Sequence, residues 1–156
     1  MNVVSVLKID EGLSLVPYID TEGYPTIAHG QRIGPKHASL DMYQFEVDKD
    51  VAEAWLKSSI DKKIEQCKPF KRIELALSAC RDSEPRHAVI LCMAYQLGAF
   101  GLNGFKKFLG AVIDHDWNRA HDEMLDSLWA KQVPNRANRL AGMMLCGEWD
   151  SYYIST

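Results

Sequence analysis

Residues 9–28 read IDEGLSLVPYIDTEGYPTIA, and this stretch decides the fold. It holds two β-rich runs, residues 15–19 and 24–28, on either side of Asp20–Gly23, whose D-x-x-G pattern is a strong turn signal. Each run contains a proline, which favours short or edge strands. The stretch therefore predicts a small β-hairpin, which is too short to be a whole sheet domain.

An amphipathic helix is predicted immediately before this hairpin. Apolar residues recur at helical spacing from Val3 to Leu7, Asn2 is a suitable N-cap, and Gly12 is a natural stop. The acidic residue that precedes the glycine, Glu11, is therefore expected in the last turn of the helix or just beyond it.

Beyond the hairpin the chain is predicted to be almost wholly helical. Ser39 is a candidate cap for a long helix over residues 40–66, whose apolar stripe passes through Trp55. Shorter helices follow, and the last of them begins at Pro134 and ends at Gly147.

These elements predict an α+β, mainly α fold in one domain that spans residues 1–156. Its parts are a small β lobe (residues 13–38), the connecting helix (residues 40–66) and a helical lobe (residues 1–12 and 67–156). A cleft between the two lobes is the expected place for a ligand, because binding sites favour such interfaces.

The composition excludes several classes of protein. Apolar residues make up 47% of the 156 residues and charged residues 25%, which is typical of a globular domain. The net charge of −3 argues against a nucleic-acid binder, although residues 131–139 carry basic and no acidic side chains. No apolar run approaches the ~20 residues of a membrane span, so we expect no stable membrane insertion. The first ten residues also lack the pattern of an export signal.

The four cysteines are spread along the chain and form no C-x-x-C pair, and they predict reduced thiols with no disulfide framework. Cys92 and Cys146 fall in apolar helical runs, where each is expected to act as a small hydrophobic residue. Because no cysteine or histidine cluster has ligand spacing, we expect neither a metal nor a cofactor.

Glu11 and Asp20 are candidates for paired-carboxyl chemistry. Glycoside hydrolysis needs one protonated carboxyl group and one ionised carboxylate. A carboxyl group at a helix C-terminus faces the negative end of the helix dipole, which disfavours its ionised form, so Glu11 suits the acid role. Asp20, at the head of a polar turn, suits the ionised role.

Taken singly, these residues have ordinary structural interpretations. An aspartate that opens a D-x-x-G turn commonly bonds its own backbone, a glutamate near a helix end is commonly solvated, and a threonine such as Thr26 is common in strands. Neither residue type nor position alone separates these interpretations from a catalytic one.

The joint spacing is more specific. Glu11, Asp20 and Thr26 form an E-x8-D-x5-T pattern that resembles the signature of the phage-type lysozymes, glycoside hydrolase family 24, of the T-even endolysin type. Similar blocks return as YQLG at residues 95–98, WAKQVPNRANR at residues 129–139 and GEWDSY at residues 147–152. The resemblance covers both ends and most of the middle of the chain, and it implies a lysozyme-like fold.

The resemblance also implies roles for individual residues. Glu11 is the general acid, Asp20 positions or activates the attacking water, and Thr26 holds that water. Arg136 matches the family arginine that pairs with the catalytic glutamate; this pairing favours the ionised form of Glu11 and opposes the dipole, and the sequence leaves that balance open. Positions that match substrate contacts of the family are Gly30, Arg32, Tyr95, Gln96, Phe108 and Glu123, the last two with different residue types.

Two departures from the family pattern stand out. Residues 28–31 read AHGQ where the family usually has G-x-G-H, so Gln31 replaces the histidine and is expected to make at most a neutral hydrogen bond to Asp50. A short deletion would instead bring His29 to the histidine position, with a catalytic-base role as the lesser alternative. The segment between Gly30 and the long helix is also shorter than in the family, which predicts a trimmed sheet wall.

The activity implied by the resemblance is hydrolysis of the β-1,4 bond between N-acetylmuramic acid and N-acetylglucosamine in bacterial peptidoglycan, with inversion. A lytic transglycosylase, a catalytically weak peptidoglycan-binding module and a delivered antibacterial toxin are the alternatives. The implied setting is a monomeric endolysin that accumulates in the host bacterial cytoplasm. It reaches the periplasmic wall after a separate pore-forming holin opens the membrane, and it causes host cell lysis.

Overall fold

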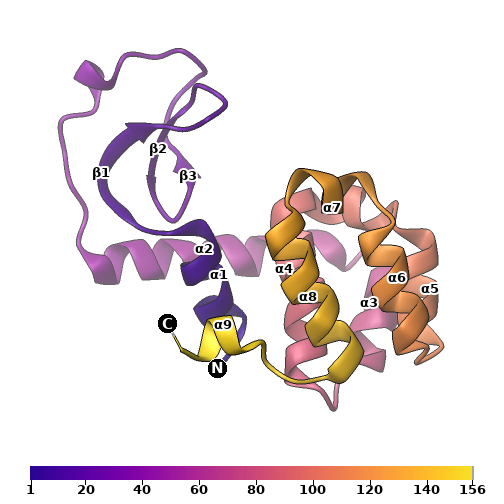
Figure 1. Cartoon of the computed structure of the whole chain (residues 1–156). Helices are drawn as coiled ribbons and strands as arrows, with labels where there is room; N and C mark the ends of the chain where they lie inside the picture. Colours follow the sequence, from indigo (N-terminus) through magenta and orange to yellow (C-terminus); the bar gives the residue numbers. More distant parts are fainter. Residues whose placement is uncertain (156) are drawn as a thin grey trace.

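The computed structural model describes residues 1–155, which form a small sheet lobe and a larger helical body joined by one long helix (Figure 1). The sheet is antiparallel, with strands β1 Ser14–Ile19, β2 Pro25–Ala28 and β3 Gln31–Arg32 in the order β1-β2-β3. Helix α2, Lys49–Cys67, runs from this lobe into the helical body. The predicted α+β, mainly α fold is therefore confirmed.

The other helices have the following bounds: α1 Val3–Glu11, α3 Lys71–Ala79, α4 Glu84–Asn103, α5 Lys106–Ile113, α6 Trp117–Leu125, α7 Leu128–Gln132, α8 Pro134–Cys146 and α9 Ser151–Ile154, with a short 3-10 helix η1 at Leu40–Met42. Predicted helix ends at Gly12 and Gly147 are confirmed, since both glycines adopt a positive φ there. Asn2 caps α1 as predicted, because its side chain accepts a hydrogen bond from the Ser5 N–H.

The sheet lobe is built around β2, all of whose residues are buried. The predicted turn joins β1 to β2, with the Asp20 N–H donating to the Tyr24 carbonyl at 2.9 Å. The sequence did not predict β3, which pairs with β2 through Thr26–Arg32 and Ile27–Gln31. This added strand brings residues 30–32 to the side of the lobe that faces the helical body.

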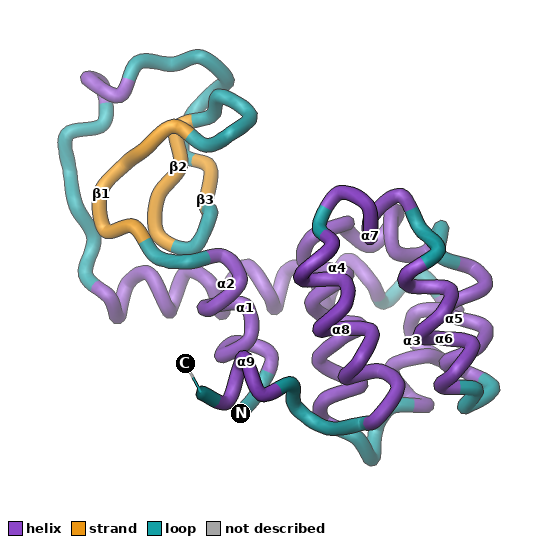
Figure 2. The backbone as a smooth tube through the Cα atoms, in the orientation of Figure 1, coloured by secondary structure: helices purple, strands orange, loops and turns teal. Residues whose placement is uncertain are grey.

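The long helix begins later than predicted. Residues 43–48 are not helical, and α2 begins at Lys49 after the N-cap Asp48. The reason is that Val47 packs against the small core of the lobe, and its N–H donates to the Leu15 carbonyl of β1 at 2.9 Å. Figure 2 shows the connecting loop passing around the outside of the sheet before it enters α2. Ser39 caps only η1.

Helix α4 forms the centre of the helical body. Its residues 88–94 are all buried, and α2, α3, α8 and α1 pack against it. Gly98 interrupts the helix with a φ of 72°. All four cysteines are free thiols, and Cys92 is buried as a small hydrophobic residue, whereas Cys146 is exposed at the end of α8.

The C-terminal segment returns to the N-terminal helix. Helix α9, which the sequence did not predict, lies beside α1, and the chain termini are close together (Figure 1). Its Tyr153 is 1% exposed and belongs to the main core.

Within residues 1–155 no single helix has the length and apolar character to cross a membrane, although α4 and α5, bent by 104° relative to each other, pass that test as a pair.

Candidate active site

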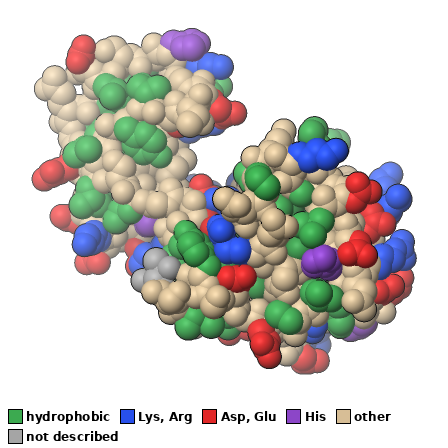
Figure 3. Space-filling view, in the orientation of Figure 1, with side chains coloured by type: hydrophobic (Ala, Val, Ile, Leu, Met, Phe, Trp, Pro, Cys, Tyr) green, Lys and Arg blue, Asp and Glu red, His purple; other side chains and the backbone are tan. Residues whose placement is uncertain are grey.

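A cleft of about 830 Å³ separates the sheet lobe from the helical body, and the notch is visible in the space-filling view (Figure 3). Of the residues that the sequence singled out, the cleft is lined by Glu11, Gly30, Arg32, Tyr95, Gln96 and Arg136. The lining residues that sequence reasoning missed are Glu22, Trp55, Ser59, Lys63 and Val133, together with Gln31, for which a different role was expected.

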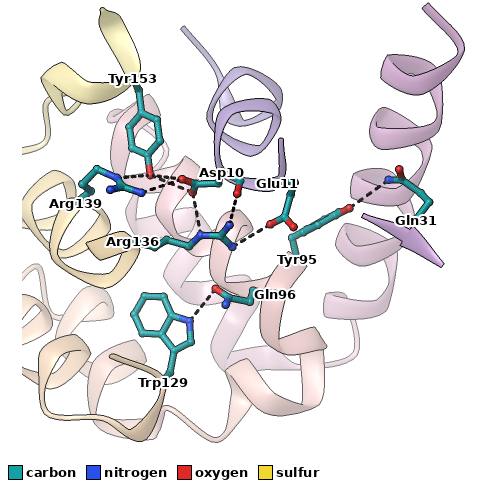
Figure 4. Close-up of polar contacts among 9 residues, drawn as sticks. All are labelled: Asp10, Glu11, Gln31, Tyr95, Gln96, Trp129, Arg136, Arg139 and Tyr153. Atoms are coloured by element: carbon teal, nitrogen blue, oxygen red, sulfur yellow. Dashed lines mark hydrogen bonds and ion pairs between the residues drawn. The ribbon is translucent and has the colours of Figure 1, made fainter. Parts of the chain in front are cut away.

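Glu11 is the last residue of α1, as predicted, and its carboxylate is held in the cleft by Arg136 (Figure 4). The Arg136 Nη1 lies 2.9 Å from Glu11 Oε1, and the Glu11 side chain is 22% exposed. The other carboxylate oxygen faces Gly30, where a Cβ would lie 3.5 Å from Oε2. Glu11 is thus fixed on one side while its second oxygen remains beside the cleft.

A buried ionic cluster holds Arg136 in place. Its Nε lies 3.2 Å from Asp10 Oδ2, and its Nη2 donates to the Asp10 carbonyl at 2.9 Å. The Asp10 side chain is 1% exposed and also contacts Arg139 Nη2 at 3.2 Å and the Tyr153 hydroxyl at 3.0 Å. We did not predict Asp10, Arg139 or Tyr153. The spacing of Arg136 and Arg139, three residues apart and so on one face of a helix, was the signal in the sequence that could have indicated such a cluster.

Asp20 is the ionised carboxylate that the sequence predicted. Its Oδ1 accepts the N–H groups of Glu22 and Tyr24, both at 2.9 Å, and its Oδ2 accepts the Arg32 Nε at 3.1 Å. The Tyr24 N–H is the main reason that the pKa of Asp20 lies below its usual value, and Arg32 acts in the same direction. The turn therefore stabilises the charge on Asp20.

Arg32 is a partner of Asp20 in this structure, where the sequence predicted a substrate contact. Its guanidinium group also pairs with Glu22 and lies 4.0 Å from the centre of the Tyr24 ring. Arg32 lines the cleft, whereas Asp20 and Thr26 do not. Its side chain therefore reaches the cleft while its charge is already satisfied by groups of its own lobe.

Thr26 lies in β2 and is 1% exposed. Its hydroxyl donates to the Tyr24 carbonyl at 3.0 Å, and because it carries one hydrogen, a bond donated to Asp20 requires rotation of that hydroxyl. In the orientation found here its oxygen is left as an acceptor next to the Asp20 carboxylate. Asp20 and Thr26 thus lie close together in the sheet lobe, but neither of them lines the cleft that Glu11 faces.

Tyr95 and Gln96 of α4 form the opposite wall, as predicted. Burial, followed by the nearby charge of Glu11, raises the pKa of Tyr95 to about 12, so its phenol stays protonated near neutral pH. Gln31 Nε2 lies 3.5 Å from the Tyr95 hydroxyl and so links the two lobes. The Trp129 N–H donates to Gln96 Oε1 at 2.9 Å (Figure 4). The amide oxygen of Gln96 therefore faces Trp129, and its amide nitrogen points away from that ring.

The AHGQ segment has a structural role that differs from the prediction. His29 is 2% exposed, its Nδ1 bonds the Gly12 carbonyl, and it does not line the cleft. Gln31 accepts the His29 N–H at 2.8 Å and contacts Tyr95, so the predicted hydrogen bond to Asp50 is replaced. Ala28 adopts a φ of 54°, a conformation that costs a non-glycine residue roughly 1 kcal/mol or more.

Two of the predicted substrate contacts, Phe108 and Glu123, do not line the cleft. Phe108 is 1% exposed and belongs to the main core, where an aromatic side chain on α5 gains more from burial than from a surface position. Glu123 lies with it at a separate depression beside α5 and α6, outside the cleft. Among residues 1–155 no group of three or more acidic, histidine or cysteine side chains is placed to hold a metal ion.

Replacing Arg32 by leucine is expected to raise the pKa of Asp20 towards its ordinary value. The rise should be partial, because the Tyr24 N–H remains and is the larger influence. A carbon-13 NMR titration of the Asp20 carboxyl group measures this directly. A midpoint unchanged by the substitution would show that Arg32 does not act on Asp20 in solution, and Lys36→Leu, a nearby cation that makes no ion pair with a described residue, is the matched control.

Comparisons with known proteins find relatives that are named as lysozymes and one phage spike protein. The chain is 32% identical to the pre-baseplate central spike protein Gp5 of Enterobacteria phage T4 over 99% of its own length, but it spans only 29% of that protein. It is 28% identical to probable T4-type lysozyme 1 of Dictyostelium discoideum, covering 97% of this chain and 98% of the relative. Probable T4-type lysozyme 2 of the same organism is 27% identical over 94% and 95% of the two chains.

No protein-family model matches the chain. The similarity to the two Dictyostelium proteins nevertheless runs from end to end, and the cleft contains the glutamate–arginine pair expected from the sequence pattern. The chain is similar along nearly its whole length to the T4-type lysozymes, and this similarity supports a phage-type lysozyme.

Proposed function

We propose that this protein is a peptidoglycan hydrolase that cleaves the β-1,4 bond between N-acetylmuramic acid and N-acetylglucosamine. The observation that carries the proposal is the Glu11 carboxyl group, held at the cleft by Arg136 at 2.9 Å and facing the lobe that contains Asp20. Glycoside hydrolysis requires two carboxyl groups of this kind: a fixed one at the cleft, here Glu11, and an ionised one nearby, here Asp20 in the adjoining sheet lobe.

In the proposed reaction Glu11 donates its proton to the glycosidic oxygen as the bond from that oxygen to the anomeric carbon breaks. Asp20 accepts a proton from a water molecule as the water oxygen bonds to the anomeric carbon. Three hydrogen bonds already occupy the Asp20 carboxylate, which leaves one of its roughly four acceptor sites for the water. The Thr26 oxygen can accept the other hydrogen of that water, and we propose inversion as the outcome.

A lytic transglycosylase is the second candidate. Such an enzyme needs the acid but no water-activating pair. The buried Thr26 beside a charge-stabilised Asp20 favours hydrolysis, since a transglycosylase gives no reason to keep the pKa of this carboxylate low. We further propose the endolysin setting: a monomer in the host cytoplasm that reaches the periplasmic wall once a holin opens the membrane.

The test is the wild-type protein on outer-membrane-permeabilised Gram-negative cells, followed by mass analysis of the released fragments. We expect loss of turbidity and fragments that end in a reducing muramic acid. Fragments lighter by one water, with an anhydro ring, would establish transglycosylation. If the folded protein cosediments with cell walls but does not lower the turbidity, its function is peptidoglycan binding without hydrolysis.

A further inference from the structure

Helix α2 presents two different stripes to its surroundings. The first stripe is buried and has a spacing of four residues: Ala52 packs in the core of the sheet lobe, and Leu56 and Ile60 pack in the core of the helical body. A second stripe at the same spacing, Trp55, Ser59 and Lys63, lines the cleft instead. The sequence predicted Trp55 as part of the apolar stripe, but the buried stripe is displaced from it around the helix.

Trp55 lacks the features of a core tryptophan. It is 36% exposed, and its indole N–H has no hydrogen-bond partner among the described residues. Trp129 provides the comparison, since it is 3% exposed and its N–H is bonded to Gln96. A large aromatic face left open to a cleft, with a free polar edge, is suited to a ligand that has both apolar and hydroxyl surfaces.

Lys63 is the uncompensated charge of the cleft. Among the described lining residues, the acidic and basic side chains otherwise form pairs, Glu11 with Arg136 and Glu22 with Arg32. Lys63 makes no ion pair with any described carboxylate, whereas the outer-face lysines Lys57 and Lys68 do. A free cation in this position favours a ligand that carries a negative charge at that end of the cleft.

We propose that Trp55, Ser59 and Lys63 form a subsite for the peptide-bearing glycan strand, with the Trp55 ring against the face of one sugar and Lys63 against a carboxylate of the stem peptide. Because Trp55 and Lys63 are eight residues apart, they lie about 12 Å from each other along the helix axis. A ligand that contacts both is therefore an oligomer. This inference rests on the proposed function for the identity of the strand, and it adds the peptide as a recognised group.

The experiment measures binding in a Glu11→Gln background, so that the strand is not cut. The probes are soluble glycan strands with stem peptides and the same strands after removal of the peptides by an amidase. The variants are Trp55→Leu, Trp55→Phe, Lys63→Met and, as the matched control, Lys62→Met, which removes the same charge from an exposed neighbour outside the cleft.

We expect Trp55→Leu to weaken binding of both probes about tenfold, and Trp55→Phe to weaken it less, because a ring face remains. Lys63→Met is expected to weaken binding several-fold for the peptide-bearing strand alone, and added salt should reduce this difference. Lys62→Met should bind as the parent does. Thermal unfolding of each variant shows that the fold is kept.

Parental binding by both Trp55→Leu and Lys63→Met would overturn the subsite. An equal loss for both probes in Lys63→Met would overturn the assignment of the peptide carboxylate. A different result would contradict the proposed function: wild-type protein that binds glycan strands without cutting them. In that case the binding of the variants would still test the subsite.

Discussion

Replacing Glu11 by glutamine is expected to lower the rate of cell-wall clearing by about 10²–10⁴-fold, the usual contribution of a general acid. Glutamine has nearly the same shape and can still accept the Arg136 hydrogen bond, so the loss would report the missing proton rather than a displaced side chain. Asp20→Asn should also reduce clearing strongly, because an amide cannot accept the proton of the attacking water. Initial turbidity rates on permeabilised cells measure both.

The matched control is Glu148→Gln, an exposed glutamate outside the cleft, which should clear at the wild-type rate. Thermal unfolding of the Glu11 variant separates a catalytic loss from a folding defect. Glu11→Gln that keeps more than about a tenth of the wild-type rate would contradict the acid role, since even the weakest general acid contributes more than this.

The parts of the site that could be predicted from sequence are those that depend on local structure. The helix that ends at Glu11 and the turn that begins at Asp20 follow from Gly12 and from the D-x-x-G pattern, and both are confirmed. The spacing of these residues with Thr26 then indicated the family. Local rules sufficed here because each residue lies within a few positions of the glycine or turn that fixes it.

The failures have a common physical cause, which is competition from tertiary contacts. No local sequence pattern predicts the hydrogen bond from the Val47 N–H to the Leu15 carbonyl, which holds this segment against β1 and delays the start of α2. Phe108 was matched to a substrate contact by position, but a phenylalanine in that place is buried in the core. Arg32 was matched in the same way and does line the cleft, but its ion pairs with Asp20 and Glu22 could not be predicted from the sequence.

The residues that support the catalytic glutamate were the least predictable. Arg136 came from the family pattern, whereas Asp10 and Tyr153 lie at opposite ends of the chain and meet only because α9 returns to α1. The result is that one arginine joins a buried carboxylate to the carboxylate of the cleft. Stability and function therefore depend on the same guanidinium group.

Replacing Asp10 by asparagine is accordingly expected to lower the free energy of unfolding by about 3 kcal/mol, the lower end of the 3–5 kcal/mol for breaking a buried ion pair. The Asp10 side chain is 1% exposed and pairs with Arg136 and Arg139, which are 15% and 22% exposed. Loss of its charge leaves these two partly buried cations with one carboxylate partner, Glu11 beside Arg136. For a chain of this size we expect a fall in Tm on the order of 10 °C.

Urea unfolding followed by circular dichroism measures this, with Glu74→Gln as the control. Glu74 also pairs with a cation, Lys71 at 2.9 Å, but its side chain is 59% exposed, so its loss should cost about 0–1 kcal/mol. Tyr153→Phe should fall between the two, at about 1–2 kcal/mol, because it removes the hydrogen bond donated to the buried carboxylate and the one accepted from Arg139 Nε. If Asp10→Asn costs no more than the Glu74 control, the charge of Asp10 does not stabilise the fold, and the bonds of Arg136 to Glu11 and to the main-chain carbonyl of residue 10 suffice to hold it.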